Sequence, residues 1–329
     1  MRIGLLAAAE SWERARAGPT AGHLAHSLVR LAATNEAAAA ALADRGHETL
    51  MITVDDPLPS RLCAAGVDLV FNTYFGPGRR QDQANVASLL EYAGLPFTGG
   101  GASCHFLGLS KPLSKRLFLA HGIPTPPFVD TTGLARAAAV EAAAAIGFPL
   151  IVKTAAEGEG IGLEESSVVR TPDELGRAMD RIAGAFADAP LVEQFLPGRE
   201  FTVGVLDGMR PVALPILELV LGDAGIYSYD AKVSGGVAER CPAPLEEPVA
   251  RIMGDLAVRA GIALGCRDCW RVDFRMDAGG EVFVLEVNTL PGLMPGYSDL
   301  PKTAEAAGLD HGQLVAAILA SAVRRSARR

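Results

Sequence analysis

Short apolar runs alternate with longer alanine-rich or polar stretches over the first 105 residues, and this pattern constrains the fold most strongly. The runs that predict strands are residues 3–6, 49–54 and 69–72. The stretches that predict helices are residues 35–45 and 81–93, and residues 7–34 are interpreted as a long loop plus a helix. Strands that alternate with helices usually pair in parallel, with helices on both faces of the sheet. The pattern therefore predicts an α/β domain with a mainly parallel sheet.

Two further regions follow with different patterns. Residues 106–190 contain a predicted helix at 111–120 and an apolar strand at 149–153, which leads into a glycine-rich stretch. The other predicted strands and helices, apart from a late hairpin, are residues 191–193, 201–206, 248–264 and 312–324. Because a chain of 329 residues is too long for one small core, we expect three domains. Their expected bounds are 1–105, 106–190 and 191–329.

Charge, hydropathy and cysteine content narrow the class of protein. A formal net charge of −8 argues against binding to nucleic-acid phosphates, which requires a basic surface. No apolar run approaches the roughly 20 residues that cross a bilayer. Five cysteines, an odd number, argue against a disulfide framework, and the lone pair Cys266 and Cys269 lacks the four ligands of a structural zinc site. We therefore expect a cytoplasmic protein without nucleic-acid or membrane partners.

The most informative motif is a pair of strand signals on either side of residues 277–280. Residues two apart on a strand share a face, so Arg271 and Asp273 point the same way, as do Glu286 and Asn288. Two carboxylates and an amide oxygen suit magnesium, which also binds substrate phosphates. The alternative is an exposed sheet face with ordinary salt bridges.

The register of this hairpin follows from the length of its turn. A four-residue turn would pair Met276 with Glu281. In that register Arg271 lies opposite Glu286, and Asp273 lies diagonal to Glu286 but within its reach. The side chains between these polar residues are apolar and are expected to face a core: Val272, Phe274, Leu285 and Val287.

The glycine-rich stretch is a candidate phosphate site. Lys153 ends an apolar strand and is followed by residues 155–162, which include three glycines. Glycines allow backbone N–H groups to approach phosphates closely, and a lysine at a strand end can neutralise their charge. No Walker pattern follows, and a surface hairpin loop explains the stretch about as well.

A second acidic segment lies at the start of the third region. Glu193 and Glu200 flank Gln194-Phe195-Leu196-Pro197-Gly198. Residues next to Glu193 could present backbone groups to an adenine edge, and Glu200 could accept hydrogen bonds from ribose hydroxyls. Each carboxylate taken singly could also be an ordinary surface acid.

Taken in order, these segments resemble the D-alanine–D-alanine ligase family of ATP-grasp enzymes, from about Asp68 to the C-terminus. The matching segments include Gly94-Leu95-Pro96-Phe97-Thr98-Gly99, Lys111, Ile151-Val152-Lys153, Glu157-Gly158, Val192-Glu193-Gln194-Phe195-Leu196-Pro197-Gly198-Arg199-Glu200, Tyr229-Asp230-Ala231-Lys232, Arg271-Val272-Asp273 and Leu285-Glu286-Val287-Asn288-Thr289-Leu290-Pro291-Gly292. The resemblance implies an α/β ATP-grasp fold, in which an N-terminal parallel-sheet domain precedes two α+β subdomains that enclose ATP.

The resemblance also implies roles for individual residues. Those that would bind ATP are Lys111, Lys153, Glu157, Gly158, Glu193, Gln194, Phe195, Leu196, Glu200 and Lys232. Those that would hold two magnesium ions, or manganese in their place, are Asp273, Glu286 and Asn288. Arg271 and Lys232 would be catalytic, and a homodimer is implied. The reaction would convert a small-molecule carboxylate or amino acid to an acyl phosphate, which an amine then attacks to form an amide bond.

The resemblance is weakest at the substrate end. The family's N-terminal motif, whose glutamate holds the donor amine, is missing, and Glu36 is a candidate substitute. Ser298, with Leu300 nearby, could bind the acceptor carboxylate, although one extra residue lies between them. The residues expected to contact substrate are Arg271, Gly292, Ser298, Leu300 and Glu36. A ligase for another amino acid or a specialised metabolite, or a non-catalytic ATP-binding regulator, stays open as an alternative.

Overall fold

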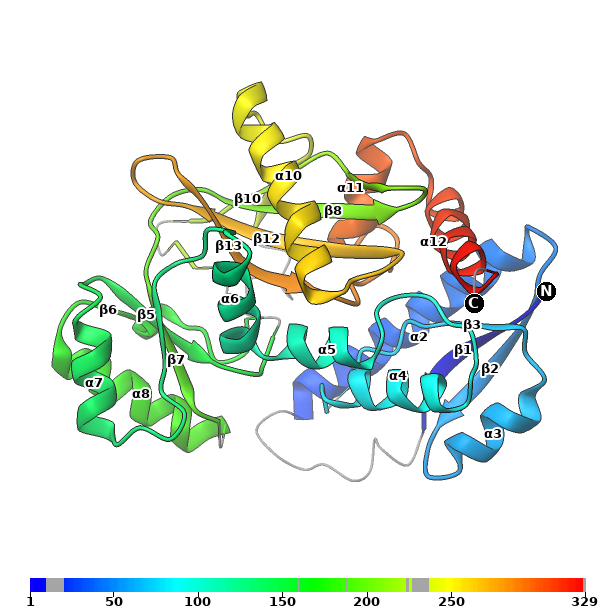
Figure 1. Cartoon of the computed structure of the whole chain (residues 1–329), viewed down its shortest axis with the longest axis horizontal. Helices are drawn as coiled ribbons and strands as arrows, with labels where there is room; N and C mark the ends of the chain where they lie inside the picture. The colour runs from blue at the N-terminus through cyan, green and yellow to red at the C-terminus, as the bar shows by residue number, and fades with distance from the viewer. Residues whose placement is uncertain are drawn as a thin grey trace.

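The structure is a computed structural model that describes residues 1–9, 21–77, 79–158, 160–186, 188–222, 225–226 and 237–327. It contains three β-sheets, which Figure 1 shows in separate parts of the molecule. The first sheet lies at the right, the second at the lower left, and the third above and between them. Helices α5 (Ala102–Leu109) and α6 (Lys111–Ala120) run across the space that the three sheets surround.

The first sheet is parallel, as the sequence predicts. Its strands in spatial order are β2 (Glu48–Val54), β1 (Arg2–Ala8) and β3 (Leu69–Phe71). Its helices are α2 (Ala21–Ala43), α3 (Leu58–Ala65) and α4 (Asp82–Tyr92). The helix expected within residues 7–34 and the helix expected at 35–45 form one continuous element, α2.

Alternate side chains of β1 enter two different cores. Ile3 and Leu5 are fully buried against α2 and the last two helices, α11 (Asp299–Ala306) and α12 (His311–Ser326). Leu6 is buried on the opposite face with residues of α3 and α4. A strand buried on both faces is typical of parallel sheets. The C-terminal helices thus complete the hydrophobic core of the N-terminal sheet.

The second sheet is antiparallel in every pairing. Its strands in spatial order are β4 (Phe128–Asp130), β7 (Pro190–Gln194), β5 (Leu150–Thr154) and β6 (Val168–Val169). Helices α7 (Arg136–Ala144) and α8 (Pro172–Phe186) pack on it over a separate core, and the short 3-10 helix Glu165–Ser167 precedes β6. Strand β7, which begins at the expected boundary near residue 190, pairs with both β4 and β5.

The third sheet is the largest. Its strands in spatial order are β11 (Ala238–Arg240), β10 (Leu217–Val220), β8 (Glu200–Asp207), β12 (Cys269–Met276) and β13 (Val282–Asn288), with β9 (Pro211–Ala213) paired to β8. Helix α10 (Glu247–Leu264) covers one face. Trp270 is fully buried against α10 and donates from Nε1 to the carbonyl of Ala257 at 2.9 Å. A Cβ on Gly261 would lie only 2.1 Å from that indole, so this glycine permits the close helix–sheet contact.

The predicted register of the β12–β13 hairpin is wrong. Arg271 pairs with Asn288, and Asp273 pairs directly with Glu286, rather than diagonally. The amide of Asp277 donates to the carbonyl of Glu281 at 3.0 Å, so the turn contains five residues instead of four. The register also shifts between Asp273 and Phe274, which leaves one extra residue on β13.

That extra residue is Leu285. It is only partly buried and lines the cavity described below, whereas Val272, Phe274 and Val287 enter the core as expected. The expectation that Leu285 faces the core is therefore wrong, because the β-bulge changes the alternation of β13 at this position.

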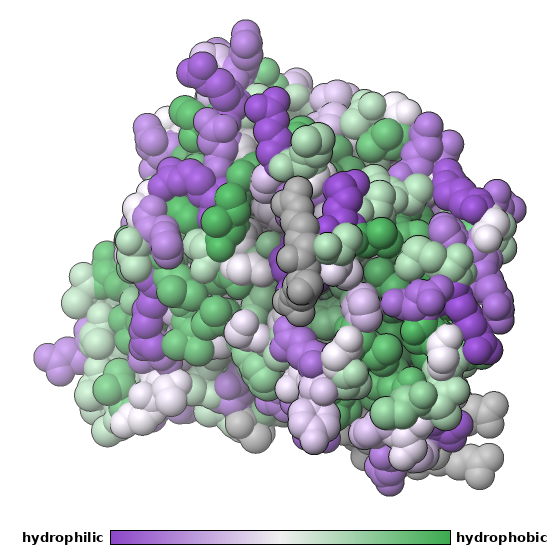
Figure 2. Space-filling view, turned by 45° about the vertical axis from the view of Figure 1, so that its right-hand side comes forward, coloured by the Kyte–Doolittle hydropathy of each residue, from purple (hydrophilic) through white to green (hydrophobic). Residues whose placement is uncertain are grey.

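The surface carries hydrophobic and hydrophilic side chains in a mixture, as Figure 2 shows for one face. Such mixing is ordinary, since more than half of a folded protein's accessible surface is apolar. Within the residues that the structure describes, no single helix is long and apolar enough to span a membrane. Helices α11 and α12 are together long and apolar enough, but the chain bends by 103° between them.

Candidate active site

A cavity that is partly open to solvent lies between the second and third sheets. Every described residue that the resemblance assigns to ATP lines it: Lys111, Lys153, Glu157, Gly158, Glu193, Gln194, Phe195, Leu196 and Glu200. Lys232 lies outside the described residues. Arg271, Asp273 and Glu286 line the opposite wall. The cavity thus brings together residues that are far apart in the sequence.

A buried group of three charges forms the wall of the second sheet. Glu193 is 1% exposed, and its carboxylate lies 2.6 Å from Lys153 Nζ and 3.0 Å from Lys115 Nζ. Burial by itself would raise the pKa of Glu193, but the two lysines hold that pKa below its usual value. Lys115 also donates to Thr125 Oγ1 at 2.7 Å. The glutamate therefore fixes Lys153 at the cavity, and its own charge is compensated from both sides.

Lys115 was not identified from the sequence. It is fully buried, and burial lowers its pKa to about 8 even though Glu193 favours the charged form. It lies four residues after Lys111, so both lysines share one face of α6. That spacing is the signal in the sequence that could have identified it.

Lys111 connects the two walls of the cavity. Its Nζ lies 3.8 Å from Glu286 and also donates to the backbone carbonyl of Glu157. Burial lowers the pKa of Lys111 to about 8, with Glu286 acting in the opposite direction. Arg80 reaches the same glycine-rich loop and donates to the carbonyl of Ala156 at 3.2 Å. Two cations therefore approach the stretch that the sequence identifies as a candidate phosphate site.

The wall of the third sheet carries an arginine between carboxylates. Arg271 donates from Nε and Nη2 to the two oxygens of Asp273, each at 3.0 Å. Its Nη1 lies 2.9 Å from Asp299, a residue that no motif in the sequence singles out. Burial alone would lower the pKa of Arg271, but Asp273 and Asp299 raise it above its ordinary value. Arg271 therefore stays charged and is held from both sides.

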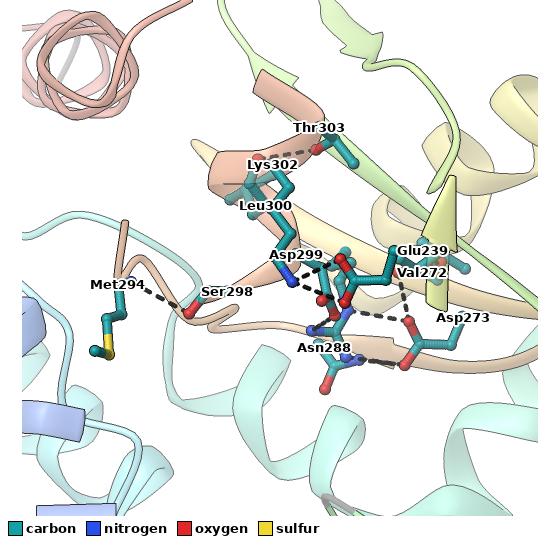
Figure 3. A network of polar contacts seen from close by, with 12 residues as sticks. Glu239, Val272, Asp273, Asn288, Met294, Ser298, Asp299, Leu300, Lys302 and Thr303 are labelled. Carbon is teal, nitrogen blue, oxygen red and sulfur yellow. Dashed lines mark hydrogen bonds and ion pairs between the residues drawn. The ribbon is translucent and has the colours of Figure 1, made fainter. Parts of the chain in front are cut away.

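Asp273 is the centre of the polar network in Figure 3. Besides Arg271, it accepts from Thr202 Oγ1 at 2.6 Å and from Asn288 Nδ2 at 2.9 Å. Glu286 lies directly opposite it on β13. The described residues contain no group of three or more histidine, cysteine, aspartate or glutamate side chains that could hold a metal. The carboxylates of Asp273 and Glu286 and the amide oxygen of Asn288 form a smaller set of ligands. Such a set fits magnesium, because this ion keeps several waters and binds substrate phosphates as its other ligands.

The segment expected to contact adenine is tied to the third sheet by Arg275. Arg275 Nη1 lies 2.5 Å from Glu200, and its Nε donates to the carbonyl of Leu196 at 2.9 Å. Its guanidinium also stacks over Phe195, 5.6 Å from the ring centroid. Arg275, which no motif in the sequence singles out, fixes both Glu200 and the backbone that precedes it.

The residues expected to contact substrate are only partly brought together. Ser298 is 7% exposed and accepts from the amide of Met294 at 3.2 Å (Figure 3), and Gly292 lies beside it. The Leu300 side chain is fully buried in the core under the first sheet, so only its backbone can meet a ligand. Glu36 is exposed on α2 and does not line the cavity between the second and third sheets.

Three of the five cysteines, Cys104, Cys266 and Cys269, are buried away from this cavity. Cys104 Sγ lies 3.6 Å from Cys266 Sγ, and both thiols are free. Burial raises the pKa of Cys266 and that of Cys269, which keeps both protonated. These thiols therefore act as small apolar side chains in the core.

Comparisons with known proteins agree with the geometry. Residues 117–320 match the family model described as "D-ala D-ala ligase C-terminus". The D-alanine–D-alanine ligase of Gloeobacter violaceus is 36% identical over 321 residues, which are 97% of this chain and 98% of that protein. The ligase of Moorella thermoacetica is 37% identical over 295 residues, 87% of this chain and 92% of that protein.

A solved structure of the D-alanine–D-alanine ligase from Bacillus anthracis, complexed with ATP, matches with a TM-score of 0.73. It is 23% identical, and the match covers 100% of this chain and 99% of that one. The predicted ATP-grasp fold is thereby confirmed. Since both the family model and relatives over nearly the whole length agree, the chain belongs to the D-alanine–D-alanine ligase family.

Proposed function

We propose that this protein is an ATP-dependent ligase that forms the peptide bond between two D-alanine molecules. The observation that carries the proposal is the arrangement of charge in the cavity. Lys111 and Lys153 face a wall with Asp273, Glu286 and Arg271, so cations for phosphates stand opposite ligands for a divalent metal. Curated relatives that match over most of their length carry the name D-alanine–D-alanine ligase, which supports the substrate.

In the first step, a carboxylate oxygen of the donor attacks the γ-phosphorus of ATP. The bond from the γ-phosphorus to the β,γ-bridging oxygen breaks. ADP departs as the leaving group, and the donor becomes an acyl phosphate. Lys111 and Lys153 neutralise phosphate oxygens, and the backbone at Gly158 allows close approach. Magnesium, held by Asp273, Glu286 and the side-chain oxygen of Asn288, would supply further charge neutralisation. Positioning and electrostatics account for most of the catalysis of such a step.

In the second step, the acceptor amine attacks the carbonyl carbon of the acyl phosphate and phosphate leaves. Negative charge develops on the carbonyl oxygen in the tetrahedral intermediate. Arg271 is the charged donor on that wall, and Asp273 and Asp299 hold its orientation. Such a preorganised donor stabilises the transition state without further rearrangement. Lys232 stays a prediction for this chemistry, as do the homodimer and the cytoplasmic location.

A phosphate-release assay tests the proposal. Purified protein with ATP and magnesium is offered D-alanine, L-alanine and a panel of other D- and L-amino acids, and the products are identified by mass spectrometry. We expect D-alanine to support phosphate release and to yield the D-alanyl dipeptide. Turnover only with other amino acids would overturn the substrate, and ATP binding without turnover would overturn the ligase activity.

A further inference from the structure

One short segment of the N-terminal region contacts both walls of the cavity between the second and third sheets. This segment, residues 79–83, leads into α4, and we call it the α4 entry. Its Arg80 contacts the glycine-rich loop that follows β5, on the wall of the second sheet. Its Gln83 contacts Thr289, the residue that follows β13 on the wall of the third sheet. The α4 entry therefore connects two walls that belong to different sheets.

Gly76 fixes the shape of the α4 entry. Its φ is +72°, in the left-handed region that favours glycine. A Cβ at Gly76 would lie only 2.5 Å from the carbonyl oxygen of Arg79 and 3.1 Å from the amide nitrogen of Gln83. The carbonyl of Arg80 in turn accepts from the amide of Gln83 at 3.0 Å. The backbone that carries Arg80 and Gln83 is therefore folded closely against Gly76, which sets the directions of both side chains.

Arg80 lies directly against the backbone of the glycine-rich loop. It donates from Nη1 to the carbonyl of Ala156 at 3.2 Å, and a Cβ on Gly158 would lie 2.0 Å from that nitrogen. Lys111 donates to the next carbonyl of the loop, that of Glu157. Gly158 lines the cavity. Arg80 thus acts on the cavity through the position of the loop.

Gln83 belongs to a buried polar group at the other wall. Its Nε2 lies 2.9 Å from His105 Nδ1 on α5 and donates to Thr289 Oγ1 at 3.1 Å. Thr289 Oγ1 and His105 Nδ1 lie 2.8 Å apart. All three side chains are buried, so the loss of one leaves the others with a partner fewer and no water to replace it. Because Thr289 directly follows Asn288, this group fixes the chain next to a proposed metal ligand.

A nucleotide with its metal must bridge the two walls. In the proposed function, the outer phosphates meet Gly158 and the lysines on one wall, while the metal ligands lie on the other. Magnesium requires near-ideal octahedral geometry at about 2.0–2.1 Å. A binding constellation of this kind has to be held to within about 0.5 Å. The separation of the walls therefore matters for a magnesium-bound triphosphate, and it matters less for a nucleotide without the outer phosphates.

We propose that the α4 entry is a brace that sets the separation of the two walls, with Arg80 and Gln83 as its positioning residues. The inference rests on the proposed ligase function, and it gives the N-terminal region a part in nucleotide binding. Neither side chain has to touch the nucleotide. Because both act through one short segment, the loss of either contact removes most of the bracing, and the two losses do not add.

The test measures binding to the full-length protein by calorimetry, with two ligands. One ligand is the non-hydrolysable β,γ-imido analogue of ATP with magnesium, and the other is AMP. In Arg80→Met and in Gln83→Met, the Kd of the magnesium-bound analogue is expected to rise about 10-fold, the lower end of the range for lost support around a metal site. The Kd of AMP is expected to stay near the wild-type value, which also shows that the variants fold.

The double variant Arg80→Met/Gln83→Met tests whether the two contacts form one brace. Its Kd for the magnesium-bound analogue should rise by much less than the product of the two single effects. Arg80→Lys keeps a cationic donor for the carbonyl of Ala156 and should lose less affinity than Arg80→Met. The matched control is Arg79→Met in the same segment, which loses an exposed pair with Asp82 at 3.5 Å and should keep both wild-type Kd values.

The outcomes separate the brace from the ligase function. An unchanged Kd of the magnesium-bound analogue in both single variants, with active wild-type protein, would overturn the brace alone. Equal weakening of AMP and of the magnesium-bound analogue would also overturn it, and so would a double variant whose loss equals the product of the single losses. A wild-type protein that neither binds the magnesium-bound analogue nor turns over would overturn the ligase function and the brace with it.

Discussion

The two ends of the proposed active site, which we call the nucleotide end and the substrate end, are built in different ways. At the nucleotide end, charged side chains project from regular elements, such as Lys153 on β5 and Lys111 on α6, and are deeply buried in mutual ion pairs. At the substrate end, Arg30, Phe75 and Tyr297 meet from a helix and two loops. The nucleotide end is therefore fixed by local motifs on rigid strands and helices. The substrate end depends on contacts between segments that are far apart in the sequence.

The largest effect is expected where the two ends meet, at Glu286. Glu286→Gln should reduce turnover by about 10²–10³-fold, the range seen when one group that stabilises transition-state charge is removed. Nucleotide binding without magnesium should persist. Phosphate release and nucleotide titration measure the two quantities. Glu281→Gln, at the exposed turn of the same hairpin, is the matched control. A fully active Glu286→Gln variant would contradict the proposal that the β12–β13 hairpin holds the metal.

The second test measures how much the buried ion pair between Lys115 and Glu193 contributes to stability at the nucleotide end. Lys115→Met leaves the buried Glu193 with one partner fewer, and this should lower the free energy of unfolding by about 3 kcal/mol. The double variant Lys115→Met/Glu193→Gln should recover part of that loss, because the uncompensated charge is gone. Denaturant unfolding measures both. Equal stability of Lys115→Met and the wild-type protein would contradict the role of Lys115 as a counter-ion.

The third test concerns the wall between the two ends. Asp299→Asn removes one of the two carboxylates that hold Arg271. We expect kcat to fall about 10-fold, since a charged hydrogen bond contributes about 1.5–3 kcal/mol, while the KM for ATP stays constant. The control is Lys302→Met, which loses the neighbouring pair with Glu239. A rise in the KM for ATP with constant kcat would place Asp299 at the nucleotide end instead.

The last test concerns a pH dependence of stability at Lys115. Its pKa is lowered to about 8 in the folded protein from 10.5. The unfolded chain therefore holds more protons between these two values, and stability should rise with pH across that window. Lys115→Met should lack this contribution. Denaturant unfolding at pH 7.5, 9 and 10.5 measures the difference between the two proteins. A difference that does not change over this range would contradict the lowered pKa.

The hairpin shows how far sequence patterns reach. Alternation places Arg271, Asp273, Glu286 and Asn288 on one face, as predicted. The predicted register of the two strands is wrong, because a five-residue turn and the bulge at Leu285 cannot be deduced from alternation. Glycine and aspartate at residues 277–280 predict a turn but not its length.

The sequence by itself determined which residue types line the cavity between the second and third sheets, because they lie in short segments whose order and spacing are informative. Only the tertiary structure decided their partners. Arg275 meets Glu200 from 75 residues away, and His26 meets Tyr297 from 271 residues away. No local pattern records such pairings, because they arise where separately folded strands, helices and loops pack together. The hydrophobic core that joins the N-terminal sheet to the C-terminal helices brings the substrate end together.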